Sequence, residues 1–402
     1  MKTAFFTQNI KRGGLDTFIL NLITNWPEQD EVLLFCNSSH PGLVALGEEL
    51  AGRAEVVPYD FLIAQDIGDR LAGIPVPLQI FFRAMFWLLG FPYLVFRTGQ
   101  LFKKFNVDRM MVINGGYPGG DACLAATIAW RRSAPGRRAW HNFHNLVLPY
   151  SAQPLRRLKE LLVDRLVAQA AAGFVTVSRA CMATLDVRSP LVDVERAFIY
   201  NGIAPTNFIS NAVMNRKPGL PAEARLILMP AVYEARKGHA LIIHAMEEIV
   251  RRVPHATLLI CGDGSPKEVD AVRHMRESST VADSIVLQGY RRGLGNLMLQ
   301  AHVLVLPSQG QESFGYTVVE AMACACPVVV TDVGGLPEVV DDGSTGYIVA
   351  RDDAVALAER IITLLQDEGL RQQMGLAGVQ RYRQRFTAAR MAAEYFRLLE
   401  KT

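Results

Sequence analysis

The feature that most restricts the fold of this chain is a regular alternation, along its second half, of short apolar runs with segments of helical period. The apolar runs that predict buried strands are Leu226–Ala231, Thr257–Cys261, Ile285–Leu287, Val303–Leu306 and Val328–Thr331. Segments such as Ala240–Val250 and Tyr316–Ala323 separate most of them and have helical period. This alternation is typical of parallel strands joined by crossover helices. We therefore expect a doubly wound α/β sheet, whose ligands bind beyond the carboxyl ends of the strands.

The first half has a similar but less regular pattern. It predicts strands near 3–7, 31–36, 54–57, 109–113, 137–143, 173–177 and 196–200, with helices near 14–25, 155–171 and 179–185. Further helices are expected over 353–366, 369–383 and 386–401. The polar stretch 204–224 contains Pro and Gly and predicts a linker. We expect two Rossmann-like domains, over 1–203 and 204–385.

The charge of the chain is unevenly distributed. The formal net charge of the 402 residues is +3, yet residues 70–165 contain 14 Lys or Arg and only 4 Asp or Glu. This segment is predicted to face an anionic partner. Because no nucleic-acid recognition module is visible and the basic residues lie beside an apolar run, we expect no nucleic-acid partner.

The apolar run is the stretch 78–96, in which 15 of 19 residues are apolar. Its length is near that of a membrane span, but Arg83 and Pro92 lie inside it, and Pro92 is expected to break the helix. Three interpretations remain open: an interfacial element, a buried helix pair and a true span. We favour peripheral membrane contact through about 78–109, with aromatic side chains at the lipid boundary.

The six cysteines are scattered and contain no CxxC pair. Cys324 and Cys326 have no second pair or nearby His, so we expect no zinc site and buried, reduced thiols. Residues 1–20 lack the features of a secretory signal. A cytoplasmic location, peripheral on the inner face of the membrane, is therefore expected.

The segment Glu312-Ser-Phe-Gly-Tyr-Thr-Val-Val-Glu320 carries the strongest chemical signal. Glu312 lies in a loop after a predicted strand, and Glu320 lies on the following predicted helix. Gly315 between them allows the backbone to approach a ligand closely. Since a helix N-terminus binds anions, the segment predicts a diphosphate site flanked by two hydrogen-bonding carboxylates. Two ordinary surface carboxylates remain the alternative.

Through this segment and further motifs, the sequence resembles retaining family-4-type glycosyltransferases of the GT-B fold, the glycosyl transferases group 1. The motifs that carry the resemblance are Glu312 to Glu320, the run Pro327 to Val339, Gly343-Ser-Thr-Gly346, Leu259 to Gly264, Tyr200-Asn-Gly202, Arg236-Lys-Gly238 and Gly13-Gly14. Together they cover about residues 7–385. The resemblance implies that the C-terminal helix 386–402 completes an N-terminal acceptor domain, and that 204–385 bind a nucleotide-sugar donor.

The resemblance also implies roles for single residues. Glu320 holds the ribose hydroxyls, Glu312 contacts the transferred sugar, and Lys237 neutralises the diphosphate leaving group. The remaining residues implied to bind the donor are Gly13, Gly14, Asn201, Gly262, Gly264, Tyr290, Phe314, Gly315, Tyr316 and Thr317. A cation that stabilises charge developing on a leaving group is a strong catalytic device in a dry cleft.

The sequence departs from the family pattern at two positions. Val232 stands where the family commonly has Arg, five residues before Lys237, and Arg236 is the candidate that supplies a second positive charge. Ala325 stands at a position that is usually glycine, where we expect only local repacking.

A histidine that faces the transferred sugar is implied within Trp140-His-Asn-Phe-His-Asn145. His144 matches best, and His141 is the competing register. A metal site formed by the two histidines, or a structural role in the core, is the alternative.

The function implied is transfer of a sugar, with retention, from a nucleotide-diphosphate donor to a glycan or lipid-linked acceptor in bacterial cell-surface polysaccharide or glycolipid synthesis. No cofactor and no essential metal are expected, because no Asp-x-Asp accompanies the donor motif. The alternatives are a sugar-nucleotide epimerase or phosphorylase of the same fold, and a catalytically weak binding subunit, which Val232 favours.

Overall fold

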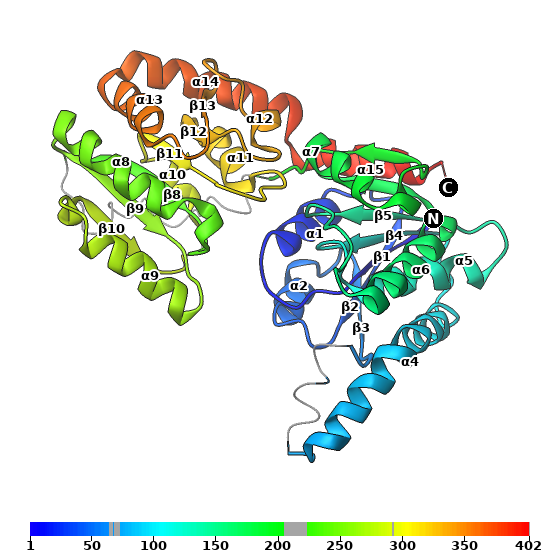
Figure 1. The fold of residues 1–402 in the computed structure, drawn as a ribbon. Coiled ribbons are helices and arrows are strands. Elements are labelled where there is room, and N and C mark those ends of the chain that lie inside the picture. The colour runs from blue at the N-terminus through cyan, green and yellow to red at the C-terminus, as the bar shows by residue number, and fades with distance from the viewer. Residues whose placement is uncertain (64–66, 68–72, 205–222, 292, 402) are drawn as a thin grey trace. The chain divides into compact units, whose positions relative to one another are not determined.

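The computed structural model describes residues 1–63, 67, 73–204, 223–291 and 293–401. The chain divides into two compact units: unit 1 comprises Met1–Tyr200 and Ala388–Thr402, and unit 2 comprises Asn201–Thr387 (Figure 1). The sequence had suggested a division at 203/204 and at 385/386. The predicted linker 204–224 lies almost entirely outside the described residues.

Unit 1 is built on a parallel sheet in the order β3-β2-β1-β4-β5-β6-β7. The strands are β1 (Lys2–Thr7), β2 (Glu31–Asn37), β3 (Glu55–Tyr59), β4 (Arg109–Asn114), β5 (Ala139–Phe143), β6 (Ala171–Thr176) and β7 (Arg196–Phe198). All seven strands predicted for this half are therefore confirmed to within a few residues. Since β1 pairs with β2 on one side and β4 on the other, the strand order changes direction at β1, where such sheets bind ligands.

Helices cover both faces of this sheet (Figure 1). They are α1 (Gly14–Thr24), α2 (Leu43–Glu49), α4 (Val76–Phe102), α5 (Asp121–Ser133), α6 (Pro154–Ala170), α7 (Arg179–Ala183) and α15 (Ala388–Leu399). The C-terminal helix α15 packs on α1, where the rings of Phe18 and Tyr395 lie 5.5 Å apart. The hydroxyl of Tyr395 also accepts a 2.8 Å hydrogen bond from Asn142 of β5.

Helix α4 is continuous over 27 residues, so the break expected at Pro92 is wrong. Its second half packs against α5 and buries Phe91, Leu94 and Phe102, and this packing holds the helix together across the proline. Its first half extends away from the sheet of unit 1 (Figure 1) and exposes apolar residues such as Phe81 and Leu88. By length and composition α4 is long and apolar enough to cross a membrane, and only 17 % of its most apolar window is buried inside the structure.

Unit 2 contains a second parallel sheet, in the order β10-β9-β8-β11-β12-β13. Its strands are β8 (Arg225–Pro230), β9 (Ala256–Cys261), β10 (Ile285–Gln288), β11 (Val303–Leu306), β12 (Val328–Thr331) and β13 (Gly346–Val349). The five strands predicted for this half are confirmed, and β13 is an edge strand that the sequence did not predict. The expected fold class, two doubly wound α/β domains, is confirmed.

Helices cover both faces of this sheet. They are α8 (His239–Arg252), α9 (Pro266–Glu277), α10 (Gly295–Met298), α11 (Tyr316–Ala323), α12 (Leu336–Val339), α13 (Ala354–Gln366) and α14 (Glu368–Arg385). The strand order changes direction between β8 and β11. The loops that follow these two strands therefore border the crevice where a doubly wound sheet binds its ligand.

Candidate functional site

The centre of the candidate site is an ion pair between Lys237 and Glu312. Lys237 lies in the loop after β8, and Glu312 lies in the loop after β11, 75 residues later. The Lys237 Nζ atom lies 2.6 Å from Glu312 Oε2, and the two side chains are only 13 % and 12 % exposed. The two residues that the sequence predicted for sugar and diphosphate thus meet at the carboxyl edge of one sheet. In partial burial this pair is screened less by salt than a surface pair.

The carboxylate of Glu312 also accepts a hydrogen bond from Ser308, a residue that sequence reasoning missed. The Ser308 hydroxyl donates to Glu312 Oε2 at 3.1 Å, and the Thr331 hydroxyl donates to the Ser308 carbonyl at 2.5 Å. Ser308 is fully buried at the end of β11. Its position two residues after a predicted strand was the only signal available in the sequence.

Three glycines allow the loops of this edge to cross each other's backbone. A Cβ atom added at Gly238 would lie 1.9 Å from the Pro307 carbonyl oxygen, and Gly238 has a φ of 78°. A Cβ at Gly262 would lie 1.8 Å from the Ala231 oxygen, and one at Gly334 would lie 1.8 Å from the Glu312 oxygen. Only glycine fits at these crossings, because any side chain would push the loops apart.

The N-terminus of α11 follows Glu312 directly. Gly315 caps the helix with a φ of 98°, and a Cβ there would lie 2.6 Å from Leu336. Phe314 before it is buried and anchors the turn, while Tyr316 and Thr317 form the first turn of the helix. The backbone N–H groups of a first turn have no partner within the helix and attract anions.

Glu320 lies on α11, one turn beyond its start. Burial raises the pKa of its carboxyl from the ordinary value to about 7. A carboxyl with this pKa binds hydroxyl groups as a charged acceptor only near or above neutral pH.

Other predicted donor residues lie at the same edge of the sheet of unit 2. Gly262 and Gly264 follow β9, and Tyr290 follows β10 with 73 % of its surface exposed. Asn201 is buried in the connection that opens unit 2, and the neighbouring Ile203 is hydrogen-bonded to the Phe386 carbonyl at 2.9 Å. The structure therefore gathers the loop residues of unit 2 at one edge, whereas Asn201 belongs to a packed connection.

Arg236 contacts residues of two loops. Its Nε atom lies 2.5 Å from Glu234 Oε2, and its Nη1 atom donates to the Gln311 carbonyl at 2.9 Å. The side chain of Val232, where the family commonly has Arg, is 45 % exposed. Arg236 thus links the loop after β8 to the loop after β11.

In unit 1, the predicted glycine loop ends in a hydrogen-bonded network. The Gly13 amide donates to Asp16 Oδ2 at 3.3 Å, and Asn9 Nδ2 donates to Asp16 Oδ1 at 2.6 Å. Asn37, at the end of β2, accepts from the Asn9 amide at 2.7 Å. Sequence reasoning missed these polar partners, although Asp three residues after the first glycine is a helix-capping signal.

His141, in β5, and His144, just after it, have different environments. His141 is fully buried, and its two ring nitrogens lie 2.8 Å from the Thr127 hydroxyl and 3.2 Å from Asn114 Nδ2. His144 follows the strand, packs its ring 4.1 Å from that of Phe18, and leaves its Nε2 atom without a hydrogen-bond partner among the described residues. Burial lowers the pKa of both rings to about 3. His141 therefore serves the core, and His144 stays the candidate for ligand contact.

All six cysteines are buried, as expected, and they form no disulfide with one another. Among the described residues, no group of three or more His, Cys, Asp or Glu side chains is placed to hold a metal ion.

Comparison with known proteins agrees with this arrangement. The sequence model of the family described as "Glycosyl transferases group 1" matches residues 211–381. A phosphatidyl-myo-inositol mannosyltransferase of Mycobacterium tuberculosis is 34 % identical over 197 residues, which cover 46 % of this chain and 49 % of that protein. An N-acetyl-alpha-D-glucosaminyl L-malate synthase of Bacillus anthracis is 28 % identical over 45 % of this chain and 47 % of its own length. The chain thus spans about half the length of the curated relatives it matches.

Solved structures match over the whole chain. A structure of Anabaena HepE in complex with UDP superposes with a TM-score of 0.76 at 18 % identity and covers 100 % of both chains. A glycosyltransferase from Rickettsia africae superposes with a TM-score of 0.78 at 18 % identity, covering 99 % of this chain and 98 % of its own. At these identities the likeness establishes the fold.

Proposed function

We propose that this chain, whose residues 211–381 match the glycosyl transferases group 1 model and which has the GT-B fold, transfers a sugar from a nucleotide-diphosphate donor to a glycan or lipid-linked acceptor. Unit 2 binds the donor, and unit 1 binds the acceptor. The products belong to bacterial cell-surface polysaccharide or glycolipid synthesis.

The observation that carries this proposal is the Lys237–Glu312 pair at the carboxyl edge of unit 2. When a glycosyl–phosphate bond breaks, negative charge develops on the leaving diphosphate. Lys237 is a partly buried cation that stabilises this charge, and the positive end of the α11 helix dipole lies at the same edge. In the absence of donor, Glu312 forms an ion pair with Lys237. When donor is bound, Glu312 contacts the hydroxyls of the transferred sugar.

Glu320 fits a role as acceptor for the ribose hydroxyls. It lies on the helix that Gly315 opens, so the ribose and the diphosphate bind along the same element. Its carboxyl, with a pKa of about 7, ionises readily when two hydroxyls donate to it, because hydrogen bonds to the charged form lower a pKa.

The stereochemistry and the independence from metals are part of the proposal. The anomeric configuration is retained, and the leaving phosphate helps to deprotonate the acceptor on the same face. Lys237, Arg236 and the helix N-termini then hold the diphosphate without an essential divalent ion and without a cofactor. The anomeric proton signal of the product and turnover after exhaustive treatment with a chelator test these two points.

Unit 1 supplies the acceptor side. His144, with a neutral ring beside Phe18, faces the transferred sugar, and Gly13 and Gly14 allow the sugar nucleotide to approach the start of α1. The protein acts in the cytoplasm, on the inner face of the membrane. Peripheral contact runs through about 78–109, because the first half of α4 exposes large apolar side chains within the basic segment 70–165.

The membrane contact is tested by flotation with vesicles of phosphatidylcholine and phosphatidylglycerol. A triple change of Ile80, Phe81 and Leu88 to Ser should abolish flotation. A control that changes Val44, Val355 and Leu376 to Ser removes three exposed apolar side chains elsewhere and should leave flotation unchanged. Equal flotation of both variants would contradict membrane contact through α4.

The proposed activity is tested by screening UDP-, GDP- and ADP-sugars for binding and for release of the nucleoside diphosphate. Release that depends on an acceptor supports transfer, whereas an epimerase changes the sugar without release. A phosphorylase would release a sugar phosphate when given inorganic phosphate. If Glu312→Ala leaves turnover unchanged, the site described here does not carry the reaction.

A further inference from the structure

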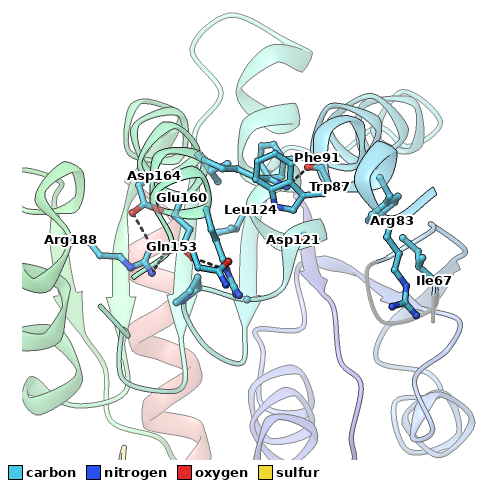
Figure 2. Close-up of a pocket in the computed structure, with 16 residues that line it drawn as sticks. Ile67, Arg83, Trp87, Phe91, Asp121, Leu124, Gln153, Glu160, Asp164 and Arg188 are labelled. Carbon is cyan, nitrogen blue, oxygen red and sulfur yellow. Dashed lines mark hydrogen bonds and ion pairs between the residues drawn. The ribbon is translucent and has the colours of Figure 1, made fainter. Parts of the chain in front are cut away.

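A cavity of about 590 Å³ lies between α4, α5 and α6 of unit 1. Figure 2 shows Arg83, Trp87 and Phe91 projecting from α4 on one side, with Glu160, Asp164 and Arg188 on the other. The remaining wall comes from the start of α5, including Asp121 and Leu124. The starts of α5 and α6 follow β4 and β5, so the cavity borders the carboxyl edge of the sheet of unit 1, where such sheets bind ligands.

The polar side of this cavity has an excess of positive charge. Its lining includes the cations Arg83, Arg156, Lys159 and Arg188 and the carboxylates Asp121, Glu160 and Asp164. The buried Arg188 binds two of these carboxylates, with Nη2 3.0 Å from Glu160 Oε2 and Nη1 3.1 Å from Asp164 Oδ2. The third carboxylate is Asp121, whose pKa is raised by burial. Arg156 also pairs with Glu160, with its Nε atom 3.2 Å from Glu160 Oε1. The lining thus has four cations against three carboxylates, an excess of one positive charge.

Lys159 fixes the two sides of the cavity relative to each other. Its Nζ atom donates to the Trp87 carbonyl at 2.6 Å and lies 5.0 Å from the centre of the Trp87 ring. An ammonium over an aromatic face is a stabilising contact. The charged rim and the aromatic wall are thus parts of one site, and the first half of α4 is held to α6.

A second cavity, of about 410 Å³, lies next to the first on the other side of Phe91 along α4. The two share Phe91, and the second is lined by apolar residues of α4, α5 and α6, including Val95, Phe96, Ile128 and Leu166, with Lys103 and Arg132 also present. Because Ile128 lies two turns into α5, this cavity leads away from the carboxyl edge of the sheet. Its lining suits a hydrocarbon chain, whereas the first cavity suits an anion.

Helix α6 exposes an apolar stripe that was not predicted from the sequence. Leu155, Leu158, Leu162 and Leu166 are 72 %, 53 %, 50 % and 40 % exposed. Their spacing of three and four residues places them on one face of the helix. Soluble proteins rarely expose such a stripe without a partner. Together with the exposed apolar residues of α4, this stripe forms an apolar surface on two of the three helices that line the cavities.

We propose that these two cavities bind a lipid that bears a phosphate, with the phosphate among Arg83, Arg156 and Lys159 and the hydrocarbon chain along Phe91 and Leu166. This inference rests on the proposed function, because it names the acceptor of the transferase as a phosphate-bearing lipid. A free phosphate would explain the cations but neither the aromatic wall nor the leucine stripe. A neutral lipid would explain the apolar surfaces but not the excess charge.

The test is calorimetric titration of the full chain with farnesyl phosphate, farnesol and inorganic phosphate, each below the concentration at which it aggregates. Trp87 gives a second readout, since it is 42 % exposed while Trp26, Trp130 and Trp140 are buried. Farnesyl phosphate should bind and change the fluorescence of Trp87. Farnesol and inorganic phosphate should each bind at least about tenfold more weakly.

Two double variants localise the binding. R83Q/R156Q removes two positive charges from the cavity and should weaken farnesyl phosphate binding about tenfold, as expected for two partly exposed ion pairs. R157Q/R165Q removes two exposed charges from α6 outside the cavity and should leave binding unchanged. Thermal unfolding of both variants checks that the fold is intact.

Three results would overturn the proposal: equal affinity for farnesol, equal affinity for inorganic phosphate, or equal losses in the two double variants. Binding of a nucleoside diphosphate, measured on the same samples, separates this inference from the proposed function. If the cavity proposal fails alone, nucleotide binding and acceptor-dependent release persist. If the transferase proposal fails alone, farnesyl phosphate still binds and R83Q/R156Q still weakens it.

Discussion

The pairing of Lys237 with Glu312 leads to a specific prediction for nucleotide binding. When a nucleoside diphosphate without sugar binds, its phosphate takes the place of Glu312 beside Lys237, and the carboxylate remains nearby without a sugar to contact. Glu312→Gln removes this negative charge while it keeps the shape of the side chain. The variant should therefore bind the free nucleoside diphosphate more tightly than the native protein, although it transfers no sugar.

The size of this effect follows from Coulomb's law. Two unit charges about 5 Å apart repel by about 0.8 kcal/mol in water and by about 3 kcal/mol at an effective dielectric constant of about 20. Lys237 and Glu312 are 13 % and 12 % exposed, so the environment lies between these limits. A gain of about 1–2 kcal/mol corresponds to binding that is about 5- to 30-fold tighter.

Isothermal titration with the nucleoside diphosphate of the preferred donor measures this change. Lys237→Met should weaken binding by a similar factor, because it removes the attractive partner. Asp270→Asn, on the exposed surface of α9, removes the same charge from the same unit and should change nothing. If Glu312→Gln binds the nucleotide no more tightly than the native protein, the carboxylate does not compete for Lys237 and the reasoning is refuted.

Further predictions concern stability, loop geometry and pH. The pKa of Glu320 is higher in the folded state than in an unfolded chain, so the native protein should lose stability as pH rises from about 4.5 to 7, and Glu320→Gln should remove this loss in denaturant titrations. Gly238→Ala should destabilise unit 2 by at least about 2 kcal/mol, since its Cβ would meet the Pro307 oxygen, whereas Gly369→Ala on α14 should not destabilise it in the same urea titration. His144→Phe should lower kcat about tenfold through loss of a hydrogen bond. Because the His144 ring has a pKa of about 3, the pH–rate profile between pH 5 and 7 should keep its shape, and a changed profile would show that the ring titrates in that range.

Much of the site in unit 2 was predictable because it depends on local patterns at strand ends. The apolar runs before Lys237 and Glu312 are short and bounded by polar residues, so the strands and the loops after them could be assigned. Parallel strands bring such loops to one edge. The pairing of the two residues with each other was not predictable, however, because a separation of 75 residues leaves their side-chain geometry undetermined.

Other elements were not predictable for physical reasons. Helix α5 was missed because residues 122–130 are all buried, so it lacks the polar face that reveals a helix by its period. The break expected at Pro92 ignored tertiary packing, since the packing of α4 against α5 outweighs one lost backbone hydrogen bond. The network of Asn9, Asp16 and Asn37 joins loops whose polar residues have no periodic signal.

The three glycine crossings at Gly238, Gly262 and Gly334 divide the edge of unit 2 into a fixed frame and an adjustable lining. Each crossing places a backbone carbonyl where a side chain would have to go, so the course of the loops leaves no room for substitution. Val232, in the loop after β8, and Tyr290, in the loop after β10, are 45 % and 73 % exposed at the same edge. Changes at these two positions alter what the crevice recognises while the path of the backbone stays the same. A library designed to alter donor choice should therefore vary the lining and leave the frame untouched.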